Sequence, residues 1–236
     1  HHMILDGWSV PIVTSDLAQL YQGECTAVAP NLDTPFLWKS HLQWLQDQDT
    51  EQATNYWKCY LSNLTTVSRL EFPPPHTPAQ GMKNLESSLS NVATEVLENY
   101  SKEQGITQAS ILQGLYALVL ARRGNLNEIV IGSVRSGRTS SLPNINTGVG
   151  LFINTLPIYI QIDPAQTLTA WLQEQQVAMA EQNVHGHIGL REIQKITGLM
   201  GEPLFEAMFV FENYPVKKTS NTIAQIELTD AQSEDG

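Results

Sequence analysis

The chain has 236 residues, of which 42% are hydrophobic and 16% are charged. This composition is typical of a globular protein that buries a sizeable core, as one large or two small domains. The formal net charge is −11 and no segment gathers lysine or arginine, so direct binding to nucleic acid is not expected. No apolar run reaches the length of about eighteen residues that a membrane-spanning helix needs. Cys25 and Cys59 have no metal-ligand spacing, and a reduced cytoplasmic location is the default.

The predicted elements alternate between helices and strands along the chain. Helical apolar periodicity occurs over 9–21, 39–61, 93–104, 109–123 and 168–183, with a break expected near Gln48. Gly23 is expected to end the first helix and Gly124 the fourth. In the helix over 109–123, the residues predicted to face inward are Ile111, Leu112, Leu115, Leu118 and Val119. Segments typical of strands occupy 85–91, 128–133, 151–162 and 207–212. This interleaving predicts layered α/β architecture, a mixed sheet flanked by helices.

A proline-rich stretch suggests how the chain is divided. Pro73, Pro74 and Pro75 are followed by Pro78 and Gly81, which is typical of a surface linker. The sequence therefore predicts a linker over 73–84 between a first part, 1–72, and a second part, 85–236.

The N-terminal string HHMILDGWS is the strongest candidate for a site. His2 and Asp6 lie four residues apart beside Gly7, and histidine is the side chain best suited to move a proton near neutral pH. Asp6 can hold the turn, cap the helix that follows, or do both, while Gly7 allows a substrate to approach the backbone closely. Two alternatives stay open: His2 is an ordinary surface histidine, or His-His-Met is the remnant of an affinity tag.

Two further patterns are weaker. The segment 132–139 has the spacing of a phosphate-binding loop, but 140–148 contains Pro143, two asparagines and a glycine, which favours a loop over the required helix. His185 and His187 could ligate a metal, as could His1, His2 and Asp6, but neither group has a recognisable set of further ligands. No nucleotide site and no metal site is predicted.

The string HHMILDGWS resembles the core motif of the condensation domains of nonribosomal peptide synthetases, relatives of chloramphenicol acetyltransferase. Other segments agree with that family in the right order: WLQ at 44–46 with the aromatic run 56–61, SGR at 136–138, VGLFINTLP at 149–157, PLF at 203–205 and VFENYP at 210–215. The chain departs from the family where Ser40 replaces a frequent acidic residue and Tyr159 replaces a usual arginine.

The resemblance implies a chloramphenicol-acetyltransferase-like fold of two lobes, which enclose a tunnel. Residues 1–72 would form the end of the N-terminal lobe, and 85–236 most of the C-terminal lobe. The family joins an upstream acyl or peptidyl thioester to the amine of a downstream aminoacyl thioester. The implied partners are donor and acceptor carrier proteins bearing 4'-phosphopantetheine and an adjacent adenylation domain, with no cofactor bound directly. The isolated chain is expected to have little activity because half of the tunnel wall is missing.

Residue roles follow from the same resemblance. The catalytic set would be His2, Asp6 and Gly7, and the substrate contacts would be His1, Trp8, Ser9 and Asn154. His2 would act as general base or would hold the attacking amine; the second role is favoured because an α-amine has a pKa near 8 and needs little help to lose its proton. Asp6 would be structural, paired with a cation whose presence in this chain the sequence leaves open, and the role of Arg138 is also left open.

Alternatives remain for the function and for some of these residues. A same-fold acyltransferase would form an ester instead of an amide, and a non-catalytic scaffold would only dock carrier proteins. Asn154, Phe205 and the VFENYP segment have strand packing as their simpler interpretation.

Overall fold

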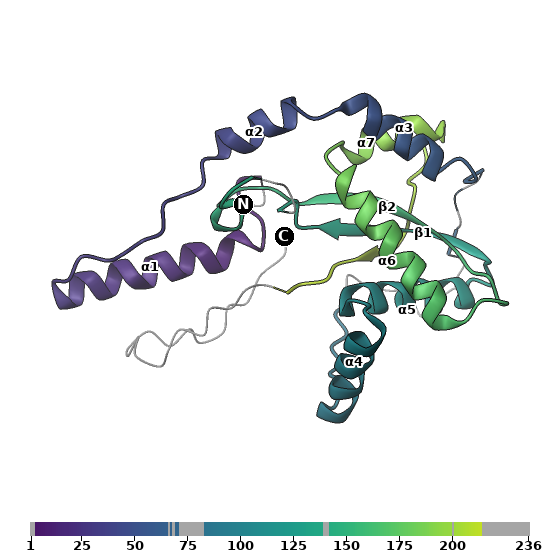
Figure 1. Ribbon diagram of the computed structural model, residues 1–236, viewed down its shortest axis with the longest axis horizontal. Helices are drawn as coiled ribbons and strands as arrows, with labels where there is room; N and C mark the ends of the chain where they lie inside the picture. Colours follow the sequence, from purple (N-terminus) through teal and green to yellow (C-terminus); the bar gives the residue numbers. More distant parts are fainter. Residues whose placement is uncertain are drawn as a thin grey trace. The chain divides into compact units, whose positions relative to one another are not determined.

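The computed structural model describes residues 3–65, 67, 69–70, 83–138, 142–199 and 201–213 (Figure 1). In these ranges no helix is long and apolar enough to cross a membrane. The helices are α1 (Ser9–Thr26), α2 (Trp38–Gln46), α3 (Thr50–Tyr60), α4 (Asn91–Gln104), α5 (Gln108–Arg123), α6 (Leu168–Val184) and α7 (Leu190–Thr197). The strands are β1 (Glu128–Arg135), β2 (Asn154–Gln161) and β3 (Met208–Phe209), and Ile145–Thr147 forms one 3₁₀ turn. The α/β class predicted from the sequence is confirmed.

The chain forms two compact units that are each assembled from separate segments. The first unit comprises 1–47, 138–153 and 212–236, and the second comprises 48–137 and 154–211. The predicted linker over 73–84 lies almost entirely outside the described residues, and the units change at other points of the chain. The division into 1–72 and 85–236 therefore stays a prediction.

The second unit is built on a three-stranded sheet with the order β2-β1-β3. β1 pairs antiparallel with β2 along its whole length, from Glu128 opposite Gln161 to Arg135 opposite Asn154, and pairs parallel with β3. α5 packs on β1 and against α6 (Figure 1), and Ser133 on β1 donates a hydrogen bond to Gln113 on α5 at 2.7 Å. Every residue of the apolar core cluster lies in this unit.

The buried face of α5 differs from the prediction. Ile111 is buried as expected, but Leu115 and Val119 are 36% and 60% exposed, and the helix instead buries Gly114, Ala117 and Ala121. The reason is the close approach of α6: a Cβ atom on Gly114 would lie 2.6 Å from Cδ2 of Leu172. Small residues, and not the largest apolar ones, therefore define the contact face.

Several helices begin or end at residues that cap helices in other proteins. Asp49, Ser90, Thr107 and Thr167 each accept a backbone N–H at the start of a helix, as side chains with a short acceptor do. The predicted break near Gln48 is confirmed, because α2 ends at Gln46 and α3 begins at Thr50. Gly124 ends α5 as predicted.

Several boundaries were predicted wrongly. The first helix continues through Gly23 to Thr26, where Ala27 adopts φ 56° and its N–H bonds back to the Gly23 carbonyl. Residues 85–90 form no strand, since Ser90 already caps α4, and the strand expected over 207–212 shortens to Met208–Phe209. The sequence patterns did not predict α7.

Candidate functional site

Asp6 forms a buried ion pair with Arg138 in the first unit. Nη1 of Arg138 donates to Oδ2 of Asp6 at 2.8 Å and Nη2 donates to Oδ1 at 2.9 Å. The Asp6 side chain is fully buried and that of Arg138 is 4% exposed. Two parallel N–H···O bonds fix both the distance and the orientation of the pair. The sequence left open whether this chain contains the cation expected beside Asp6, and the structure shows that it is Arg138.

Three further donors complete the shell of the Asp6 carboxylate. The Ser9 N–H and hydroxyl donate to Oδ1 at 3.0 and 2.9 Å, and the Phe152 N–H donates to Oδ2 at 3.0 Å. The Asp6 N–H in turn donates to the Gly150 carbonyl at 3.1 Å. We call Asp6, Ser9, Arg138, Gly150 and Phe152 the aspartate clamp. The clamp ties the segment that follows the histidine pair to a segment more than 140 residues later in the chain.

Ser9 forms hydrogen bonds to Asp6, Arg138 and Gly150 of the clamp. Its Oγ accepts from the Gly150 N–H at 3.0 Å and from Nη2 of Arg138 at 3.1 Å, and lies within 3.0 Å of the Gly150 carbonyl oxygen. Ser9 is fully buried and begins α1. Asp6 accepts the Ser9 N–H and so holds the turn before α1, but the N-cap position itself is occupied by Trp8.

Aromatic rings surround the charged pair. The Arg138 guanidinium carbon lies 4.3 Å from the centre of the Phe152 ring, a cation–π distance. Trp38 and His41 of α2 pack against the same ring at centroid distances of 4.7 and 4.9 Å. A Cβ on Gly150 would lie 2.5 Å from the Trp38 ring, so this close approach requires glycine.

Arg138 influences the protonation of two buried groups, Asp6 within the clamp and His41 beside it. Burial raises the pKa of Asp6, but the hydrogen bonds from Arg138, Phe152 and Ser9 and the charge of Arg138 outweigh it, and the pKa lies below its ordinary value. Burial lowers the pKa of His41, and the positive charge of Arg138 lowers it further. Asp6 is therefore ionised and His41 neutral at pH 7.

The predicted site residues have different environments. His1 and His2 lie outside the described residues, and Gly7 and Trp8 are half-buried beside the clamp. The Ser9 hydroxyl bonds to Asp6, Arg138 and Gly150, all within the clamp. Asn154 lies in the second unit, where its amide donates to the carbonyls of Gly186 and Ile188 at 2.8 and 2.9 Å. The proposed substrate contacts of these side chains stay predictions.

The structure also assigns partners that the sequence did not indicate. The role of Arg138 was left open, and neither Gly150 nor Phe152 was singled out as a partner of Asp6. Arg138 lies in the SGR segment, and Gly150 and Phe152 lie in the VGLF segment. Nothing in these two segments alone indicates a bond to Asp6. Gly137, which precedes Arg138, has φ 65°, a left-handed conformation that glycine adopts without strain.

Other sequence patterns have no site in the described part of the chain. No group of three or more histidine, cysteine, aspartate or glutamate side chains is placed to hold a metal there. The His185 ring stacks on Tyr56 at a centroid distance of 4.4 Å. The phosphate-loop-like segment begins inside β1, and Arg138 near its end is committed to Asp6.

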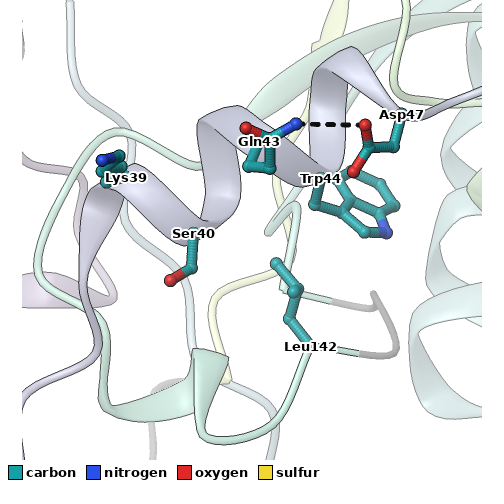
Figure 2. A pocket seen from close by; sticks show the side chains of 6 residues that line it. All are labelled: Lys39, Ser40, Gln43, Trp44, Asp47 and Leu142. Atoms are coloured by element: carbon teal, nitrogen blue, oxygen red, sulfur yellow. Dashed lines mark hydrogen bonds between the residues drawn. The ribbon is translucent and has the colours of Figure 1, made fainter.

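An open groove of about 360 Å³ lies on the first unit, lined by Lys39, Ser40, Gln43, Trp44, Asp47 and Leu142 (Figure 2). Most of these residues share one face of α2, where Gln43 donates to Asp47 at 3.1 Å. The groove contains no member of the aspartate clamp.

Comparisons with known proteins agree on one family. A sequence profile described as "Condensation domain" matches residues 1–235. The chain is similar to a linear gramicidin synthase of Brevibacillus parabrevis, with 31% identity over 240 residues that cover 100% of this chain and 5% of that protein. Bacitracin synthase 3 of Bacillus licheniformis is 32% identical over 219 residues, 92% of this chain and 3% of that protein.

Solved structures show the same fold. The first condensation domain of the CDA synthetase superposes with a TM-score of 0.73 at 18% identity, covering 91% of this chain and 48% of that one. The chain thus spans about half of this solved domain and a small part of the curated relatives.

Proposed function

Because the chain belongs to the condensation-domain family, we propose that it takes part in peptide-bond formation in nonribosomal peptide synthesis. The amine of a carrier-bound aminoacyl thioester attacks the carbonyl of a carrier-bound acyl or peptidyl thioester. The amide bond forms as the carbon–sulfur bond breaks, and the upstream carrier leaves as a thiol. Since the chain spans about half of a related solved domain, the activity is proposed for the whole domain that contains it.

The aspartate clamp is the observation that supports this proposal. It joins three strings that the family carries in the same order, through Asp6 of HHMILDGWS, Arg138 of SGR, and Gly150 and Phe152 of VGLF. These residues contact one another through buried, charge-assisted hydrogen bonds. An ion pair with this many partners restricts the turn that carries the histidine motif.

His2 is proposed to contact the attacking amine. A free α-amine has a pKa of about 8, so a sizeable fraction is neutral near pH 7 and a strong base adds little. Positioning two tethered reactants contributes far more to the rate. We assign to His2 the orientation of the amine and, late in the step, acceptance of its proton, with Asp6 holding the motif and Gly7 leaving room for the substrate.

The proposal includes the partners. Donor and acceptor carrier proteins would deliver both substrates on 4'-phosphopantetheine, and an adenylation domain in the same synthetase would load one of them. No cofactor is proposed to bind directly to this chain. A cytoplasmic location is also proposed, and the two free, exposed cysteines support a reducing compartment.

The test uses the intact enzyme that contains this chain. Both carrier proteins are loaded, and formation of the carrier-bound amide product is measured by mass spectrometry. We expect His2→Ala to reduce the single-turnover rate about 100-fold or more, whereas Glu24→Ala on the exposed end of α1 should leave it unchanged. A His2→Ala enzyme with an unchanged rate would overturn the catalytic assignment and favour a carrier-docking scaffold.

Two further experiments test the ester-forming alternative and the activity of the isolated chain. Replacement of the acceptor amine by a hydroxyl tests the ester-forming reaction, and faster ester than amide formation would contradict the proposal. The isolated chain should form little product, and addition of the other half of the domain should restore formation that depends on His2.

A further inference from the structure

Arg135, the last residue of β1, is a half-buried cation in the second unit. Of the ion pairs formed by the described residues, none includes Arg135. Its hydrogen bond from Nη2 to Oε1 of Gln182 measures 3.5 Å, longer than the usual distance of about 2.7–3.2 Å. The Arg135 Nε is buried and has no hydrogen-bond partner among the described residues. An arginine in this position is costly, since buried charges in proteins are normally paired.

The Tyr60 hydroxyl beside Arg135 is already satisfied by other neighbours. Gln182 is 1% exposed and donates from Nε2 to the Tyr60 hydroxyl at 2.8 Å. That hydroxyl donates to the Tyr159 carbonyl at 2.9 Å and accepts from the Tyr159 N–H at 3.0 Å. The Tyr60 hydroxyl therefore has no lone pair left for the guanidinium, and Gln182 offers it only the long contact from Oε1.

A second donor nearby also lacks a partner. The Tyr56 ring stacks on Tyr60 with an interplanar angle of 7° and a centroid distance of 5.9 Å, and the buried Tyr56 hydroxyl makes no hydrogen bond within the described part of the chain. The unmatched groups around Tyr60 include the Arg135 guanidinium and the Tyr56 hydroxyl. The cluster thus has two donors without an acceptor among the described residues, with the positive charge of Arg135 near Tyr60 and the carboxylate of Glu181 near Tyr56.

We propose that Arg135 is an anion-binding residue that holds a small oxyanion, a carboxylate or a phosphate group, at the end of β1. A guanidinium offers five N–H donors in a planar fork that matches the oxygens of either group. Arg135 as a whole residue is only half-buried, so an anion can reach it from solvent. Binding requires no part of the condensation reaction and is independent of the function proposed above.

The protonation of Arg135 agrees with this role. Burial lowers its pKa to about 10, with Tyr60 opposing the shift. The side chain therefore remains charged near neutral pH, while desolvation strengthens its attraction for an anion.

The test is anion titration of the folded chain, with inorganic phosphate and acetate as separate probes at ionic strength matched with sodium chloride. The Nε–H signal of Arg135 is identified in the ¹H–¹⁵N spectrum by its loss in Arg135→Met. We expect saturable movement of this signal and a rise in Tm of about 5 to 10 °C at about 100-fold over the Kd. The relative affinities for phosphate and acetate distinguish the two ligand classes.

Two variants are compared with the wild type for stability and for their response to the anions. Arg135→Met should be at least as stable as the wild type without added anion and should not respond to either probe. Arg122→Met, which removes an exposed arginine at the end of α5, should respond like the wild type. If the wild-type chain shows neither saturable movement of an arginine Nε–H signal nor a rise in Tm with either probe, the proposal is overturned, and this outcome is read on the wild-type chain alone.

Discussion

The aspartate clamp predicts a large and coupled loss of stability in the first unit. Asp6→Ala removes the acceptor of five hydrogen bonds, from Arg138, Ser9 and Phe152, and leaves a buried guanidinium without its counter-charge. Breaking a buried ion pair in this way costs about 3–5 kcal/mol. Arg138→Met leaves the Asp6 carboxylate buried and should cost about the same.

The double variant is the decisive comparison. Asp6→Ala with Arg138→Met removes both charges, so the second substitution should add little and the coupling energy should be about 3 kcal/mol. Asp16→Ala on α1 is the matched control and should change stability by less than about 0.5 kcal/mol.

Native-state hydrogen exchange resolves the two units separately. The Phe152 N–H, which donates to Asp6, and the Asp6 N–H, which donates to Gly150, report on the first unit. The amide of Ile131 in β1 reports on the second. The reasoning is refuted if the two single effects add to within about 0.5 kcal/mol, or if protection of Ile131 falls as much as that of Phe152.

The same assay measures the pH dependence. The pKa of Asp6 is lowered in the folded protein, so its contribution is fully present above the unfolded value of about 3.9 and is lost as the pH falls through the folded value. Protection of the Phe152 N–H should therefore decrease below about pH 4, and Asp6→Asn should remove this dependence.

Three other substitutions test separate features. The pKa of His41 is lowered by burial and by Arg138, so protonation of His41 below about pH 6.5 should destabilise the first unit. In His41→Phe, hydrogen-exchange protection of the first unit should not decrease over this pH range. Gly114→Val should cost about 1–3 kcal/mol in urea denaturation because its Cβ would overlap Leu172; a cost below about 0.5 kcal/mol would contradict the close helix contact. Asn154→Ala leaves two loop carbonyls without donors and should cost about 1–3 kcal/mol by the same measurement, whereas an effect on activity without loss of stability would favour substrate contact.

Local signals predicted much of the fold. Helical periodicity and capping residues located α5 and α6 to within one residue of their observed ends. One failure has its cause in tertiary packing. Leu115 and Val119 were predicted to be buried on α5 because they are large and apolar, yet the short distance to Leu172 selects Gly114 for the contact.

The sequence predicted only part of the candidate site. The string around Asp6 marked the right turn, but its ion-pair partner Arg138 lies 132 residues away, and periodicity carries no signal over that separation. Gly150 and Phe152, which also bond to Asp6, are equally distant in the sequence, so the clamp exists only in the assembled fold of the first unit.

The two units differ in what stabilises them. The apolar core cluster lies wholly in the second unit, whereas the buried side chains of the first unit include the polar or charged Asp6, Ser9, His41 and Arg138. Apolar burial is insensitive to pH, but an ion pair and a neutral histidine each depend on protonation. The unit that holds the histidine motif should therefore lose its structure first on acidification, with protection in β1 retained, and simultaneous loss of both would show that the clamp is not what holds the first unit together.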